Sequence, residues 1–92
     1  MTVGSLRVRL LIRESQSLKD KRQVVKSIKD RLANRFNVSV AEVDGLESRQ
    51  VAVLGFAMVG NEAAHVRAAL EQIVQALRSH PVAELLDHEL TV

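Results

Sequence analysis

The segment SLKDKRQVVKSIKDRL, residues 17–32, concentrates positive charge, because it holds six Lys and Arg residues but only two acids. Lys and Arg side chains form charge-assisted hydrogen bonds with phosphate oxygens, so a row of them along one surface is typical of a protein that holds a nucleic-acid backbone. We therefore treat this segment as a candidate RNA contact surface. Its candidate phosphate-binding residues are Lys19, Lys21, Arg22, Lys26 and Lys29.

Helical spacing separates most of these charges from an apolar sector. Four of the basic residues fall in the sector adjoining it. The apolar sector spans about 80° of arc on a helix and holds Leu18, Val25, Ile28, Leu32 and Phe36. Lys21 falls inside the apolar sector, and we expect its stem to cover the end of the sheet while its ammonium stays near the helix N-terminus. Only Lys26 has an acid, Asp30, placed for an i,i+4 ion pair. The four residues that form this basic stripe are Lys19, Arg22, Lys26 and Lys29.

Charge is distributed unevenly along the chain, although the net charge is only +2. The first 37 residues hold ten bases and three acids, whereas residues 61–92 hold two bases and five acids. This asymmetry favours a polyanionic partner for the N-terminal half, and a helix face that is merely solvated is the alternative. Arg7 and Arg9 precede the helix in a stretch without acids, so they are further candidates for phosphate contact.

The chain lacks the features with which several RNA-binding domains read bases. Its only aromatic residues are Phe36 and Phe56, so stacking of bases on a sheet surface, as in an RRM, is not expected. A GxxG loop of the KH type is also absent. We therefore expect contacts mainly with phosphates, which make binding sensitive to salt and weakly dependent on sequence.

Residues for catalysis or metal binding are sparse. The chain has no cysteine and no glycine-rich phosphate loop. Glu62 and His65 have the i,i+3 spacing of half a di-iron site, but no second copy of the motif is present. His80 and His88 have no nucleophile beside them in the sequence. We therefore expect a protein that is not an enzyme and that uses no metal and no cofactor.

Apolar periodicity predicts six elements. They are a strand over residues 6–13, a helix from N-cap Ser17 to about Arg35, a strand over 38–44, a strand over 50–59, a helix capped by Asn61 and ending before Pro81, and a strand over 84–90. In strand 38–44 the apolar phase changes between Val40 and Ala41, which indicates a bulge or burial on both faces. The order of elements is that of the ferredoxin-like βαββαβ fold. We predict one α+β domain over residues 1–92, with two helices on one face of a four-stranded antiparallel sheet.

Strand 50–59 is apolar on both of its faces, although only one face of the sheet meets the helices. The apolar residues of the other face must then be shielded from water by another surface. This favours a homodimer packed through sheet faces or edges. We expect Val53 or Phe56 near that interface. A protein-interaction module that uses this face is therefore the alternative to an RNA- or ribosome-associated protein.

The length and hydropathy of the chain indicate where in the cell the protein is located. A chain of 92 residues has room for one core, and none of its apolar runs approaches the ~18 residues that span a bilayer. The Met1 end shows no basic segment followed by an apolar run and a cleavage site. We therefore expect a cytoplasmic protein without a membrane partner.

The run ESQSLKDKRQVVKSIKDRLANRFNVSVAEVD, residues 14–44, closely resembles the signature of the YlxP-like family of small bacterial proteins. The likeness extends over nearly the whole chain and includes VLGFAMVGNEAAHV, residues 53–66. It implies a ferredoxin-like fold and, because the genes of the family usually lie beside translation-initiation and ribosome-maturation genes, a link to RNA or the ribosome. The family supplies no catalytic residue to carry over. Many relatives have His after the Asp of AEVD, where this chain has Gly45.

Overall fold

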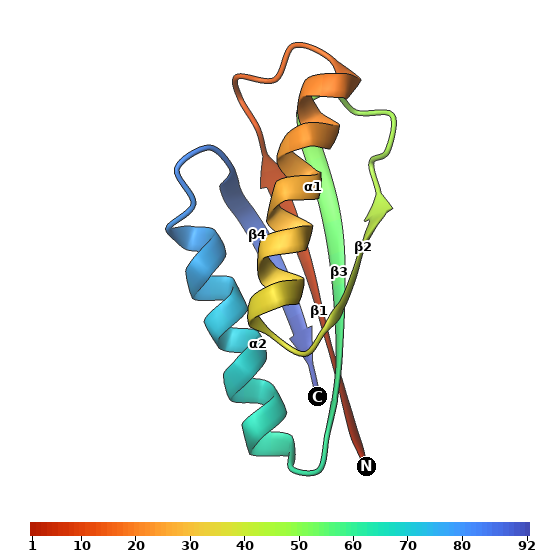
Figure 1. The fold of residues 1–92 in the computed structure, drawn as a ribbon, viewed down its shortest axis with the longest axis vertical. Coiled ribbons are helices and arrows are strands. Elements are labelled where there is room, and N and C mark those ends of the chain that lie inside the picture. The colour runs from red at the N-terminus through yellow and green to blue at the C-terminus, as the bar shows by residue number, and fades with distance from the viewer.

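The computed structural model describes residues 1–92 and confirms the predicted order of elements (Figure 1). The four strands form one antiparallel sheet in the order β2-β3-β1-β4, and both helices lie on one face of it, as in the ferredoxin-like fold. Neither helix combines the length and the apolar composition that crossing a membrane requires. The elements are β1 (Thr2–Leu11), α1 (Leu18–Arg35), β2 (Ser39–Asp44), β3 (Val51–Gly60), α2 (Ala63–Arg78) and β4 (Glu84–Thr91).

The core lies between the sheet and the helices. Strand alternation turns every second residue of β1 and β3 towards the helices, while their neighbours form the opposite face of the sheet, which we call the outer face. The helices contribute their apolar sectors to the same cluster. Among the residues that are almost fully buried in it are Leu6, Val8, Leu10, Leu54, Phe56, Leu70 and Ile73.

Helix α1 begins where the sequence predicts. The hydroxyl of Ser17 accepts a hydrogen bond from the backbone N–H of Asp20 at 3.1 Å, and the carboxylate of Asp20 lies in the first turn, where the helix dipole favours negative charge. The expectation for α2 is wrong by one residue, because Glu62 and not Asn61 occupies the N-cap position. No side chain caps α2, whose first turn is exposed to solvent.

A bulge occurs in β2, three residues after the predicted phase change. Glu42 pairs with Leu54 and Asp44 with Val53, which leaves Val43 as the extra residue on the outer face. A Cβ atom on Gly55 would lie only 2.9 Å from Cγ1 of Val43, so the glycine permits this close approach of the two strands. The bulge ends β2 and leads into the turn at Gly45, whose φ of 67° suits glycine.

Candidate nucleic-acid interface

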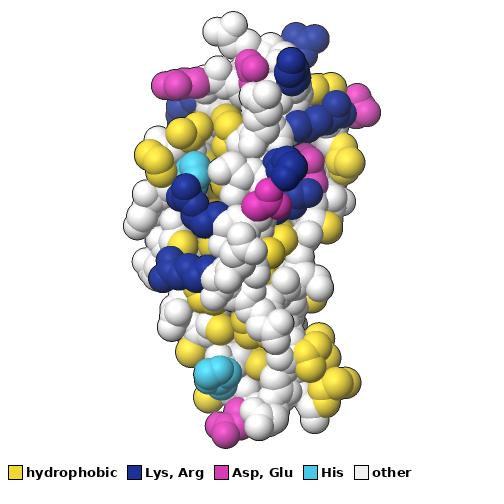
Figure 2. Space-filling model, in the orientation of Figure 1, with side chains coloured by type: hydrophobic (Ala, Val, Ile, Leu, Met, Phe, Trp, Pro, Cys, Tyr) yellow, Lys and Arg dark blue, Asp and Glu magenta, His cyan; other side chains and the backbone are white.

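The basic stripe lies on the helical side of the molecule. Its position follows from the burial of the neighbouring apolar sector, in which Val25, Ile28 and Leu32 pack against the core. Lys19, Arg22 and Lys26 are exposed and Lys29 is half-buried. Figure 2 shows that Lys and Arg side chains gather on this face over α1, with Asp and Glu side chains beside some of them.

Most of the positive charge on α1 is unpaired. The predicted pair between Lys26 and Asp30 is confirmed, with 2.7 Å between Nζ and Oδ2, and the hydrogen bond from this lysine to the carboxylate raises the pKa of Lys26. Lys21 is the only other base of α1 with a carboxylate within 4.0 Å. The five without such a partner are Lys19, Arg22, Lys29, Arg31 and Arg35.

Lys21 is buried and cannot contribute to a phosphate-binding surface, which corrects the prediction. Its side chain is 0 % exposed, because its place in the apolar sector turns it under the loop between β2 and β3. Its ammonium donates hydrogen bonds to the carbonyls of Gly45 at 2.8 Å, Val51 at 3.2 Å and Leu46 at 3.4 Å. The ammonium therefore reaches the loop between β2 and β3 from the first turn of α1.

Glu42 completes the surroundings of the buried lysine. Its Oε2 atom lies 3.0 Å from Nζ of Lys21 in a side chain that is 13 % exposed. This oxygen is an ion-pair partner of Lys21 without a hydrogen bond, while the ammonium donates to the carbonyls of the loop and of the first residue of β3. Lys21 thus fastens the β2–β3 loop to the first turn of α1. The sequence signal for this role was a lysine within an apolar helix sector.

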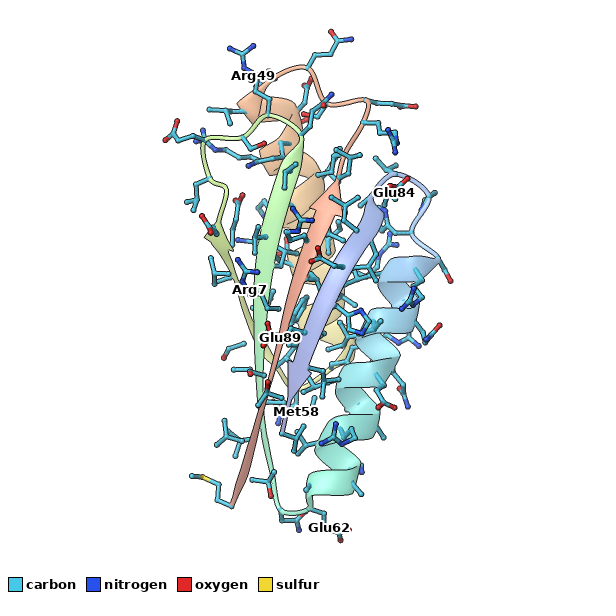
Figure 3. The ribbon with its side chains drawn as sticks, turned by 180° about the vertical axis from the view of Figure 1, so that it is seen from behind. Arg7, Arg49, Met58, Glu62, Glu84 and Glu89 are labelled. Atoms are coloured by element: carbon cyan, nitrogen blue, oxygen red, sulfur yellow. The ribbon has the colours of Figure 1, made fainter.

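Arg7 and Arg9 lie on the outer face, so the expectation that they assist the basic stripe is wrong. Strand alternation directs both away from the helices (Figure 3, where Arg7 is labelled). Each also has an acidic partner, with Arg7 3.6 Å from Asp44 and Arg9 2.7 Å from Asp87. The hydrogen bond from Arg9 lowers the pKa of Asp87. The charge of the outer face is therefore locally neutralised.

Two arginines that the sequence analysis did not select lie on the other flank of α1. Arg31 and Arg35 line a groove of about 500 Å³ between α1 and α2. The signal was present on the helical wheel, because residues 31 and 35 fall beside the apolar sector on the side opposite the basic stripe. Helix α1 therefore carries positive charge on both flanks of its apolar sector.

The hollow beside the basic stripe is lined by acidic residues as well as basic ones, unlike the groove between the helices. Arg22, Lys26 and Lys29 line a smaller hollow of about 370 Å³ together with Asp30 and Glu42. No carboxylate lines the groove between the helices. The stripe is thus an open, partly neutralised surface, whereas the interhelical groove is uniformly basic.

The two residues predicted at a sheet interface are not exposed there. Phe56 is 2 % exposed and faces the helices, which excludes it from the outer face. Val53 faces outward but is 4 % exposed, in a position between Arg9 of β1 and Asp44 of β2. The exposed apolar residues of the outer face are Val3, Val43, Val59 and Leu86, beside a shallow hollow of about 520 Å³ over Gly55 and Ala57.

The remaining candidates for chemistry are dispersed. No three His, Asp or Glu side chains gather where they could share a metal ion. Glu62 and His65 lie at the exposed start of α2 (Figure 3, where Glu62 is labelled). His88 lies on the edge strand β4 opposite Val8.

Comparison with known proteins agrees with the sequence resemblance. Residues 3–90 match the family described as "Protein of unknown function (DUF503)". The chain is also 30 % identical over 82 residues to "Uncharacterized protein YlxP" of Bacillus subtilis (strain 168), an alignment that covers 89 % of each protein. The chain therefore belongs to the YlxP-like DUF503 family of proteins of unknown function.

Proposed function

We propose that this protein binds structured RNA, ribosomal RNA included, by contacting phosphates with α1 and without reading the bases. The observation that carries the proposal is that five Lys and Arg side chains of one helix have no carboxylate within 4.0 Å. Unpaired surface cations attract the phosphate backbone and release its counterions on contact. Cations that already have an acidic partner attract the phosphate backbone less strongly.

The contrast between the two faces of the molecule supports this orientation. On the outer face Arg7 and Arg9 each lie within 4.0 Å of a carboxylate, as does Arg13 just after the end of β1. On the helical face only Lys26 has an exposed acidic partner. A polyanion is therefore attracted to the helical face.

The dimensions of α1 set the scale of the contact. The helix has 18 residues, which corresponds to a length of about 27 Å. Four or five phosphate contacts along it would give a slope of log affinity against log salt of roughly −3 to −5. Because the chain has no aromatic residue on its exposed sheet face, we expect little discrimination among RNA sequences.

The test compares two double variants with the same change in charge. Arg22→Gln with Lys29→Gln removes two unpaired cations from the basic stripe, and Arg7→Gln with Arg9→Gln removes two paired cations from the outer face. Fluorescence anisotropy with a labelled RNA hairpin, measured between about 50 and 300 mM salt, should show the slope flattened by about 1 to 2 for the stripe variant only. Equal slopes for the parent and the stripe variant, or equal losses in both variants, would contradict the proposal.

A second candidate function is self-association through the outer face. Val59 is 57 % exposed there, and Val3, Val43 and Leu86 are exposed as well. Because the arginines of this face are paired, two copies can approach each other without the repulsion that the helical face would cause. Sedimentation at micromolar concentration should show a dimer that Val59→Lys dissociates. A parent protein that remains monomeric over this range would refute the homodimer.

A further inference from the structure

The groove between the two helices is the most uniformly basic hollow of the molecule. It lies where α1 and α2 run side by side, and in Figure 2 a His side chain lies next to Lys and Arg side chains in this region. Apolar contact is available from Ala76 and Pro81, above the buried side chains of Leu32 and Leu77. The polar residues that line it are Arg31, Arg35, Gln72, Gln75, Ser79 and His80.

Arg31 and Arg35 are held one helical turn apart without a counter-charge. Like charges at i,i+4 destabilise a helix by a few tenths of a kcal/mol, and no acid of this chain relieves the repulsion. The guanidinium of Arg35 lies 5.2 Å from the centroid of the Phe36 ring, which restricts its orientation. A pair of guanidinium groups in an acid-free groove suits a phosphate group, whose oxygens accept bidentate hydrogen bonds.

His80 adds a polar group of defined orientation. Its Nδ1 atom accepts hydrogen bonds from the backbone N–H groups of Val82 at 3.2 Å and Ala83 at 3.0 Å. The hydrogen of the neutral ring is therefore on Nε2, which remains free as a donor. Burial and the charge of Arg31 lower the pKa of His80, which agrees with a short distance between the two side chains.

We propose that the interhelical groove binds a nucleoside monophosphate unit, with its phosphate on Arg31 and Arg35. The volume of about 500 Å³ lies within the range of small-molecule sites. The ring of the base packs on Ala76 and Pro81, and the amides of Gln72 and Gln75 provide donors and acceptors for the sugar or the base edge.

The same chemical unit occurs as a free nucleotide and as the phosphorylated end of an RNA chain. The groove lies on the flank of α1 opposite the basic stripe, so binding of a nucleoside monophosphate does not require the RNA contacts proposed for the stripe. If both sites act on one RNA, the groove holds a terminal nucleotide while the stripe contacts the backbone that follows. The ligand used in the experiment distinguishes these sources.

The first measurement is a titration of the ¹⁵N-labelled protein with adenosine monophosphate, followed by NMR. We expect saturable shifts confined to residues of the groove, among them the side-chain amides of Gln72 and Gln75. Adenosine without phosphate and inorganic phosphate should each bind more weakly, because each supplies only part of the contact. The double variant Arg31→Gln with Arg35→Gln should weaken binding of the nucleotide at least about tenfold, since it removes two charge-assisted interactions.

The matched control is the stripe variant Arg22→Gln with Lys29→Gln, which has the same net charge. It should change the affinity for adenosine monophosphate by less than about threefold, because its charges lie on the other flank of α1. Shifts that do not saturate, or equal losses in the two variants, would overturn the proposal. A 5′-phosphorylated RNA that binds no better than the same RNA with a 5′-hydroxyl would assign the groove to free nucleotides. Failure of the RNA proposal alone would leave nucleotide binding intact.

Discussion

Replacing Lys21 by Met tests whether the buried lysine stabilises the fold. Met preserves the length and much of the apolar volume of the stem, so the substitution mainly removes the ammonium. The change leaves the carboxylate of Glu42 without its partner at 3.0 Å and removes the ammonium that donates to the carbonyls of Gly45, Leu46 and Val51. Of these carbonyls, that of Gly45 keeps a hydrogen bond from the backbone N–H of Ser48. These groups lie within the fold or at its edge, where lost partners are only partly replaced by water.

The expected loss follows from the burial of the pair. Breaking a buried ion pair by removal of one partner costs about 3–5 kcal/mol. Glu42 keeps 13 % of its side-chain surface in contact with solvent, and the loop carbonyls lie close to the surface, so we expect a value near the lower limit. A loss of about 3 kcal/mol corresponds to a decrease in Tm of roughly 12–24 °C for a domain of this size.

Urea denaturation followed by circular dichroism measures this loss of unfolding free energy. Two further variants show which interaction causes it. Lys26→Met makes the same substitution in the same helix at an exposed ion pair with Asp30, and should cost less than about 1 kcal/mol. Adding Glu42→Gln to Lys21→Met removes the unpaired buried charge and should recover about 1–2 kcal/mol.

Two results would refute this reasoning. The first is a loss of less than about 1 kcal/mol for Lys21→Met, which would mean that the loop and Glu42 rearrange at little cost. The second is a double variant no more stable than Lys21→Met, which would show that the buried charge of Glu42 is not the source of the penalty. Both results are read from the same denaturation curves.

Three further predictions concern packing and titration. Gly4→Ala places a Cβ atom 2.6 Å from Cγ1 of Val66 beneath α2, so it should lower the free energy of unfolding in urea by about 1–3 kcal/mol. The pKa of Asp87, lowered by the hydrogen bond from Arg9, should rise towards its ordinary value in Arg9→Gln when followed by NMR; the stabilisation from this carboxylate is present above its unfolded pKa and is lost as pH falls through its folded pKa. The pKa of His80 is lowered mainly by burial, so its contribution to thermal stability should be present above about pH 6.5 and be lost as the pH falls through its folded pKa, and His80→Asn, which keeps an acceptor at the position of Nδ1, should remove this dependence.

Local features of the chain were sufficient to predict the elements and their order. The predicted local features depend on residues no more than four positions apart. They are the N-cap at Ser17, the end of α1 at Arg35 and the ion pair between Lys26 and Asp30. Apolar periodicity predicted the faces of the strands for the same reason, because side-chain direction alternates with each residue. The order of six elements then allowed few compact topologies, and the ferredoxin-like arrangement is the one observed.

The tertiary structure alone decided which of these residues are available for binding. Lys21 is withdrawn from solvent by a loop 24–30 residues away in the chain, and Arg7 and Arg9 are neutralised by acids brought beside them from β2 and β4. Both rows of β3 are apolar in sequence, and only the position of the helices determines that Phe56 is in the core. The groove at Arg31 and Arg35 likewise requires α2 to pack beside α1. Contacts between residues distant in sequence depend on how all the elements pack together, and a local pattern does not contain that information.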